Sequence, residues 1–233
     1  MEEERDKNVG LSGEGGWRKT GLVSPRESVA VLVAHPDDET LWAGGTLLMQ
    51  SGWAPFVTTL CRASDADRAP KFQRALAELS AAGKMADLDD GPEQAPLADE
   101  QVEQALLAQL PTRHFERILT HCPAGEYTRH LRHEEVARAV LRLWLAGELS
   151  APELWLFAYE DGGGEHLPRA VAAADITVEL PPEIWRRKLH LVTGIYGFAS
   201  DSWEARVTPR REAFFRVKNP VEASAWLTPK YAP

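Results

Sequence analysis

The chain has 233 residues, of which 44% are hydrophobic and 26% are charged, and its formal net charge is −9. A chain of this length and balance is typical of one globular domain that buries a sizeable core. The acidic net charge disfavours nucleic acid as a partner, because nucleic-acid binding needs a basic surface.

Three further features of the sequence concern where the protein works. No apolar run is long enough to cross a bilayer. Residues 1–26 are acidic and rich in glycine, without the apolar segment of a secretory signal, and we expect a flexible arm there before a single domain over residues 27–233. The two cysteines, Cys61 and Cys122, are too few for a disulfide scaffold. The sequence therefore predicts a cytoplasmic protein without a membrane span, and its eight tryptophans could support a homo-oligomer.

Buried strands and amphipathic helices alternate along residues 28–160. The continuous apolar and β-branched run at residues 28–34 predicts a strand that is buried on both faces. The next expected strands are residues 55–60, 85–88, 115–119 and 154–159, and the expected helices are residues 40–52, 71–83, 99–110 and 133–146. This alternation predicts an α/β protein, with a Rossmann-like three-layer fold, a mostly parallel central sheet and helices on both faces.

The pattern weakens after residue 160. A strand at residues 176–180 and a helix at residues 182–195 are expected, and the proline and glycine residues around them indicate loops over one edge of the sheet. The charged residues Arg186, Arg187 and Lys188 predict a solvated face on that helix.

The first strand ends abruptly in the polar sequence HPDDE, residues 35–39. In open parallel sheets, ligands bind outside the carboxyl ends of the strands. A phosphate-binding GxGxxG is missing here, which disfavours a dinucleotide. Imidazole and carboxylate are instead the ligand types that hold Zn²⁺ or Fe²⁺. His35 and Asp38 are three residues apart, so both side chains can bend toward one point on a strand-to-helix turn, while Asp37 can point into the cavity instead.

A second polar segment, THCPAGEYTRHLRH at residues 120–133, follows the fourth strand and should emerge at the same edge of the sheet. His130 and His133 are also three residues apart and share a face if a helix begins there. One imidazole can bind a metal while the other reaches a substrate. His121 could equally support such a site or simply pack in the core.

These two segments together, AHPDDE and a later THxPxGEY…HxxH, resemble the PIG-L/LmbE family of zinc-dependent N-acetylglucosaminyl deacetylases over residues 28–160. The resemblance implies hydrolytic removal of an acetyl or other acyl group from an N-acetylated amino sugar or a related metabolite. It also implies that His35, Asp38 and His133 bind zinc and that Asp37 is the general base. His130 would polarise or protonate the intermediate, and Tyr127 would stabilise the oxyanion. Arg62 and Arg68 would bind sugar hydroxyls or phosphate.

The chain also departs from the family pattern. The usual His-Pro-Asp-His is His-Leu-Arg-His here, so that Arg132 replaces the aspartate that would orient the imidazole of His130. A cation beside His130 would lower the pKa of the imidazole and weaken it as an acid. Residues 188–203 lack the usual closing His-x-Ser-Gln, which leaves the substrate open.

Three other functions stay open on the sequence. A degenerate family member could bind metal and ligand without turnover. An Fe²⁺ oxygenase would use His35, Asp37 and a distant histidine as its two-His-one-carboxylate ligands. A regulatory module with an Mg²⁺ site would use the acidic pair after the first strand, but it leaves His35 and His133 unexplained.

Overall fold

The computed structural model describes residues 26–127 and 130–228. The expected arm at residues 1–26 therefore lies outside the described residues except for Arg26. The strands in chain order are β1 (Glu27–Val33), β2 (Trp53–Thr59), β3 (Ala82–Met85), β4 (Arg117–Thr120), β5 (Leu154–Phe157), β6 (Tyr159–Glu160), β7 (Arg169–Ala170), β8 (Ile176–Glu179) and β9 (Arg211–Val217). The helices are α1 (Asp38–Met49), α2 (Arg68–Glu78), α3 (Asp99–Gln109), α4 (Leu131–Leu145), α5 (Pro182–His190), the π-helix η1 (Leu191–Ile195), α6 (Trp203–Val207) and α7 (Pro220–Trp226).

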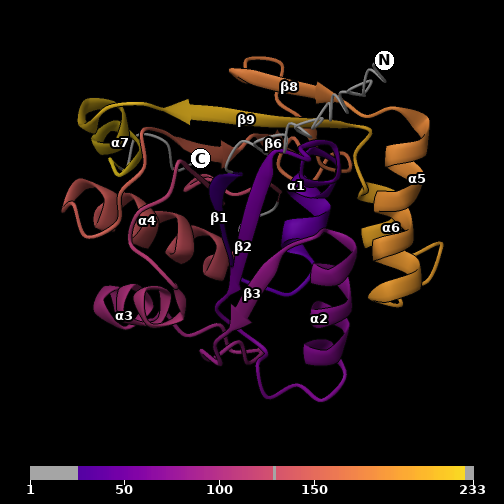
Figure 1. Cartoon of the computed structure of the whole chain (residues 1–233), viewed down its shortest axis with the longest axis horizontal. Coiled ribbons are helices and arrows are strands. Elements are labelled where there is room, and N and C mark those ends of the chain that lie inside the picture. The colour runs from indigo at the N-terminus through magenta and orange to yellow at the C-terminus, as the bar shows by residue number, and fades with distance from the viewer. Residues whose placement is uncertain (1–25, 128–129, 229–233) are drawn as a thin grey trace, which may run out of the picture.

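A seven-stranded sheet in the order β3-β2-β1-β4-β5-β9-β8 forms the centre of the fold. The first five strands of this order are parallel, and β9 and β8 continue the sheet antiparallel. Helices α3, α4 and α7 cover one face, and α1, α2 and α5 cover the other (Figure 1). The predicted Rossmann-like three-layer fold is therefore confirmed.

The residues of β1 explain why its apolar run has no polar interruption. Val29, Val31 and Val33 pack in the core on the α1 and α2 side of the sheet. Ala30 and Leu32 alternate with them and pack in the core on the α3 and α4 side. Because successive side chains of a strand point to opposite faces, a central strand covered on both sides needs an apolar residue at every position.

The region after residue 160 differs from the expectation of loops over one edge. Strand β9 pairs with β5 along Leu154–Phe157, and β8 pairs with β9, so this region extends the sheet. The helix expected at residues 182–195 is present, but its last turn is the π-helix η1. The short strand expected at residues 85–88 lies slightly earlier, as β3.

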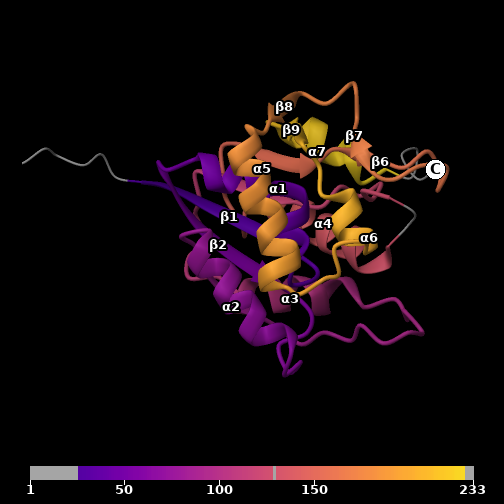
Figure 2. The same ribbon diagram turned by 90° about the vertical axis from the view of Figure 1, so that its right-hand side faces the viewer.

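The prediction that Lys188 lies on a solvated face is wrong. Lys188 is fully buried, and its Nζ donates a hydrogen bond of 2.5 Å to Glu212 Oε1 on β9. Glu212 also accepts hydrogen bonds from the backbone N–H groups of Gly45 and Thr46 on α1, at 2.7 and 2.6 Å. The buried ion pair therefore joins α5, β9 and α1, and α5 lies beside α1 in Figure 2.

A close approach between α1 and Leu180 requires a glycine at position 45. A Cβ on Gly45 would lie 2.3 Å from Leu180 Cδ1, which is far inside van der Waals contact.

Among the described residues, the helices are all too short or too polar to span a bilayer.

Candidate metal and catalytic site

The turn between β1 and α1 places the residues of the HPDDE segment. Asp37 has a φ of 138°, and its carbonyl oxygen accepts hydrogen bonds from the N–H groups of Thr40 and Leu41, at 3.0 and 2.8 Å. Asp38 is the first residue of α1, and its Oδ2 accepts a hydrogen bond of 2.8 Å from the backbone N–H of His35. This local bond folds the two side chains toward the same point.

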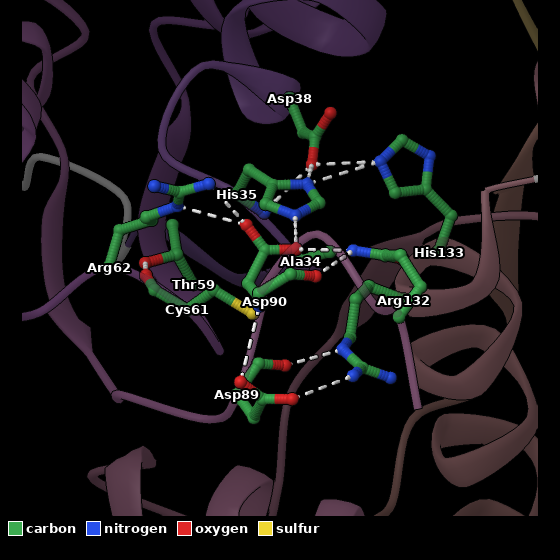
Figure 3. A network of polar contacts seen from close by, with 12 residues as sticks. Ala34, His35, Asp38, Thr59, Cys61, Arg62, Asp89, Asp90, Arg132 and His133 are labelled. Atoms are coloured by element: carbon green, nitrogen blue, oxygen red, sulfur yellow. Dashed lines mark hydrogen bonds and ion pairs between the residues drawn. The ribbon is translucent and has the colours of Figure 1, made fainter. Parts of the chain in front are cut away.

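Three atoms from this turn and from α4 form a nearly equilateral triangle. His35 Nδ1 lies 3.2 Å from Asp38 Oδ2, His133 Nε2 lies 3.4 Å from the same oxygen, and the two imidazole nitrogens are 3.3 Å apart. Figure 3 shows these side chains pointing toward one another. Donor atoms that bind a tetrahedral zinc at its usual bond lengths lie about 3.3 Å from each other. The triangle therefore has the dimensions of three zinc ligands.

Hydrogen bonds on the outer side of each imidazole direct lone pairs into this triangle. His133 Nδ1 lies 2.7 Å from Glu126 Oε2, and His35 Nε2 lies 3.1 Å from Asp90 Oδ1. When these outer nitrogens carry the protons, His133 Nε2 and His35 Nδ1 are left as lone-pair donors beside the carboxylate of Asp38. Lone pairs that converge in this way can hold a cation between them, so the donor set fits a metal ion.

The charges around the triangle also favour a cation. Burial raises the pKa of Asp38, but His133 and His121 outweigh burial and hold this pKa well below its usual value. Burial lowers the pKa of His35, but hydrogen bonds to Asp38 and Asp90 outweigh burial and raise this pKa to about 9. The carboxylates thus stabilise positive charge at this point, which a divalent ion supplies.

Glu126 and His121 support the triangle from inside the protein. Glu126 is 1% exposed, and its Oε1 accepts a hydrogen bond of 3.0 Å from the backbone N–H of Cys122. Burial raises the pKa of Glu126, but His121 and His133 outweigh burial and lower this pKa to about 2. The ring of His121 is fully buried and stacks on that of His133 at 3.9 Å between centroids, so His121 supports the site rather than only filling the core.

The carboxylate of Asp37 is bound by Arg68 and lines the same cavity as the triangle. Its Oδ2 accepts a hydrogen bond of 3.1 Å from Arg68 Nη1. Burial and then the charge of Asp38 raise the pKa of Asp37 well above its usual value, and the charges of His35 and Arg68 oppose them. The Fe²⁺ oxygenase hypothesis needs Asp37 as a ligand, and a carboxylate that is bound to Arg68 gives this hypothesis no support.

His130 lies against the two histidines of the triangle. Its ring is 4.4 Å from that of His133 and 4.8 Å from that of His35. Burial, followed by the charges of His133 and His35, lowers the pKa of His130 to about 4, so that it is neutral at pH 7. One possible metal-binding group combines His130 with His35 and His133, and another combines Asp38, His121 and His133.

Arg132 does not face His130, contrary to the expectation from the His-Leu-Arg-His sequence. Its guanidinium donates to Glu135 Oε2 at 2.5 Å, to the carbonyl of Ala95 at 2.8 Å and to that of Asp89 at 2.6 Å. Figure 3 shows Arg132 directed at Asp89, away from the triangle. The lowered pKa that was predicted for His130 is present, but burial and the neighbouring histidines cause it.

A cavity of about 300 Å³ brings together all eight residues singled out from the sequence. These are His35, Asp37, Asp38, Arg62, Arg68, Tyr127, His130 and His133. The two arginines already have partners, because Arg62 Nη2 lies 2.7 Å from Asp90 Oδ2 and Arg68 binds Asp37. Arg62 keeps 47% of its side chain exposed.

Sequence reasoning missed several residues of this site. Glu126 lies within the recognised GEY segment, and Asp90 precedes a glycine in the turn that follows β3. Trp42, which the sequence assigned to the core or to a pocket wall, lines the cavity, and its indole N–H donates to Asp38 Oδ1 at 3.3 Å. Trp203 and Glu204 reach the cavity from α6, and Trp203 packs on Tyr127 at 4.8 Å between ring centroids. Only Glu126 had a signal in the sequence, namely an acidic residue between two predicted site histidines.

Comparison with known proteins gives structural matches only, since neither a family model nor a curated protein matches the chain. N,N′-diacetylchitobiose deacetylase from Pyrococcus horikoshii matches with a TM-score of 0.62 and 14% identity, over 82% of this chain and 84% of that one. The zinc-inhibited form of teicoplanin deacetylase Orf2 matches with a TM-score of 0.55 and 16% identity, over 77% and 88%.

The 4-carboxy-2-hydroxymuconate hydratase GalB from Pseudomonas putida KT2440 is a further match, with a TM-score of 0.56 and 14% identity over 82% of this chain and 96% of that one. Since a hydratase shares the fold with deacetylases, the fold alone does not fix the reaction. At these identities the likeness concerns the fold, and there it agrees with the resemblance found in the sequence. This chain has the fold of the PIG-L/LmbE-type deacetylases.

Proposed function

We propose that this protein is a zinc-dependent N-deacetylase that hydrolyses the amide of an N-acetylated amino sugar or a related metabolite. The observation that carries the proposal is the triangle of His35 Nδ1, Asp38 Oδ2 and His133 Nε2, with spacings of 3.2 to 3.4 Å. Three protein ligands that leave one position open are typical of a catalytic zinc site. When bound, zinc lowers the pKa of a water molecule and polarises a carbonyl group.

The residues around the triangle suit the two proton transfers of amide hydrolysis. Asp37 is the base that accepts the proton of the attacking water and passes it to the amine as the C–N bond breaks. The hydrogen bond from Arg68 fixes the carboxylate of Asp37, and the charge of Arg68 opposes the rise in its pKa that burial and Asp38 cause. The products are acetate and the free amine.

His130 and Tyr127 suit the carbonyl oxygen of the substrate, where negative charge develops. His130 is neutral at pH 7 and can donate one hydrogen bond. Burial raises the pKa of Tyr127, so its hydroxyl also remains a donor. Arg62 and Arg68 line the same cavity, and Arg62 is exposed enough to bind polar groups of a substrate.

The substrate class follows from the cavity and from the structural neighbours together. The cavity of about 300 Å³ matches a small metabolite, and Trp42, Tyr127 and Trp203 give it an apolar wall. Two of the matched structures are deacetylases of a chitobiose derivative and of teicoplanin, which supports an N-acetylated sugar as the substrate class.

Because Cys61 and Cys122 are both buried as free thiols, the cytoplasm stays the proposed location.

Metal content and acetate release test the proposal together. Untagged wild type, Asp38→Ala and Asp37→Asn proteins are purified without chelator, and metal is measured by mass spectrometry. We expect about one zinc per chain in the wild type and in Asp37→Asn, and a large loss in Asp38→Ala. Acetate release from a panel of N-acetylated amino sugars should be rapid with the wild type and should fall to a small residual rate in both variants.

The alternatives give different results in the same experiment. Zinc at the same low level in the wild type and in Asp38→Ala would overturn the metal site. Bound zinc without acetate release across the panel would support the degenerate member that binds without turnover. Full activity of Asp37→Asn would remove Asp37 as the base.

A further inference from the structure

The backbone of Asp37 is held in a conformation that its side chain disfavours. Its φ of 138° lies in a region that residues other than glycine rarely adopt. Such a residue persists only where surrounding contacts hold it, and these contacts concentrate at functional sites. The contacts that hold Asp37 therefore decide where its carboxylate points.

A buried relay holds the backbone of Asp37 from the far end of the sequence. The N–H of Asp37 donates a hydrogen bond of 3.1 Å to Glu39 Oε2. Glu39 is fully buried, and its Oε1 accepts a hydrogen bond of 2.7 Å from the hydroxyl of Tyr196. Tyr196 is 2% exposed, so water does not compete for its hydroxyl. The hydroxyl of Thr40 also donates to Glu39 Oε1, at 2.6 Å, so Tyr196 and Thr40 together fix the acceptor for the backbone of Asp37.

The π-helix η1 sets the direction of Tyr196. The N–H of Tyr196 donates to the carbonyl of Leu191 at 2.9 Å, five residues earlier. One residue more per turn rotates the subsequent side chains by about 100° relative to an α-helix. Leu191 and Val192 are buried at the start of this turn and anchor it. With ordinary α-helical winding, Tyr196 would not face Glu39.

The same segment also reaches the side chain of Asp37 by a second route. Gly197 has a φ of +80°, which reverses the chain after Tyr196 and brings Phe198 against Arg68. The guanidinium of Arg68 lies over the ring of Phe198, 4.5 Å from its centroid. Arg68 in turn donates to Asp37 Oδ2 at 3.1 Å. Tyr196 therefore acts on the backbone of Asp37, and Phe198 acts on its carboxylate.

We propose that Tyr196 and Phe198 are positioning residues that aim the carboxylate of Asp37, Tyr196 through Glu39 and Phe198 through Arg68. This inference rests on the proposed function insofar as Asp37 is the base. It gives a role to the region after residue 190, where the chain lacks the closing motif of the family that it resembles. It also explains why a π-helix interrupts the helix at this position.

The variants for the test are Tyr196→Phe and Phe198→Leu, with Tyr159→Phe as the matched control. Tyr159 is also a buried tyrosine whose hydroxyl donates to α1, at 2.9 Å from the carbonyl of Trp42, but it does not reach Glu39. We expect kcat to fall about tenfold in Tyr196→Phe and in Phe198→Leu, with KM within roughly twofold of the wild type, because misplacing a base slows the chemical step more than binding. Tyr159→Phe should keep kcat within roughly twofold.

Combination with Asp37→Asn tests whether the effect passes through Asp37. In that background, Tyr196→Phe should leave the residual rate unchanged, because the two changes act on one group. A kcat for Tyr196→Phe equal to that of Tyr159→Phe would overturn the inference. An additive loss in the double variant would also overturn it.

Crystal structures of the three tyrosine and phenylalanine variants give a readout that does not depend on activity. We expect the φ of Asp37 to leave the positive region in Tyr196→Phe, and Arg68 to separate from Asp37 in Phe198→Leu. An unchanged Asp37 in both variants overturns the inference even if the wild type proves inactive. A wild type that releases no acetate, together with a displaced Asp37 in both variants, overturns only the proposed function.

Discussion

Glu126 Oε2 lies 2.7 Å from His133 Nδ1, and Glu126 Oε1 lies 3.2 Å from His121 Nδ1. The carboxylate of Glu126 therefore fixes the ring orientation and the protonated nitrogen of His133, and it lies within ion-pair distance of His121, whose ring stacks on that of His133. This arrangement leaves His133 Nε2 as the lone-pair donor that faces Asp38 and His35. The position of Glu126 in the GEY segment thus has a structural reason.

We expect Glu126→Ala to weaken zinc binding by about 10- to 100-fold, which is the usual cost of losing the partner of a metal-bound histidine. Glu126→Gln keeps an oxygen that can accept the hydrogen bond from His133, so its loss should be smaller. Competition with a chelator of known affinity measures both. Zinc affinity in Glu126→Ala equal to that of the wild type would show that His133 needs no such partner.

The position of His130 leads to a second prediction, which separates catalysis from metal binding. The ring centroids of His130 and His133 are 4.4 Å apart. His130 is not one of the three residues whose ligand atoms form the triangle with sides of 3.2 to 3.4 Å. We expect His130→Ala to retain zinc and to lose about 100- to 1,000-fold in kcat, the usual cost of removing a donor to a developing oxyanion. Metal analysis beside steady-state kinetics checks both parts. Loss of zinc from His130→Ala would instead favour the group of His35, His130 and His133 as ligands.

The sequence predicted those parts of the fold and site that depend on local pattern. Residues 29–33 of β1 alternate between the two cores. They are all apolar because β1 is a central strand that is buried on both faces, as the sequence predicted. His35 and Asp38 come together through a single turn, closed by the N–H of His35 on Asp38 Oδ2. Spacing of this kind is readable from a sequence, since three residues of chain determine it.

The parts that escaped prediction depend on pairing between distant segments. Lys188 looks like a surface residue beside two arginines, and only the position of Glu212 on β9 makes its burial possible. Strand β9 lies between β5 and β8 and still carries charges within an apolar run, and the buried Glu212 among them is accepted because Lys188 pairs with it. Trp203 reaches the cavity from α6, and nothing in its neighbouring sequence indicates this. The close approach at Gly45 is likewise visible only once Leu180 is placed.

The buried pair of Lys188 and Glu212 yields a prediction for stability. We expect Lys188→Met to lower the free energy of unfolding by about 3 kcal/mol, because the change leaves Glu212 buried without its cation. Arg187→Met is the matched control, since Arg187 is the exposed neighbour on the same helix, and its effect should stay within about 0.5 kcal/mol. Urea unfolding of both variants gives the comparison. Equal stability of the two would mean that the pair contributes nothing beyond the apolar stem of Lys188.

Glu153, at the opposite end of the sheet from the metal site, should make stability depend on pH. Burial raises its pKa, but hydrogen bonds from Arg216 and Trp155 and the charge of Arg117 outweigh burial and hold this pKa below its usual value. The pKa of this carboxyl is lower in the folded state than in the unfolded state, where it is near 4.5. Glu153 therefore stabilises the fold at pH values above 4.5, and this stabilisation is lost as the pH falls through the folded pKa. Glu153→Gln should therefore be less stable than the wild type at pH 7, with a difference that shrinks below about pH 4.5. Urea unfolding between pH 7 and pH 3 measures this, with the exposed Glu148→Gln as the control that should follow the wild type throughout. A difference between the wild type and Glu153→Gln that stays constant over this range would show that packing of the side chain, and not its charge, accounts for the effect.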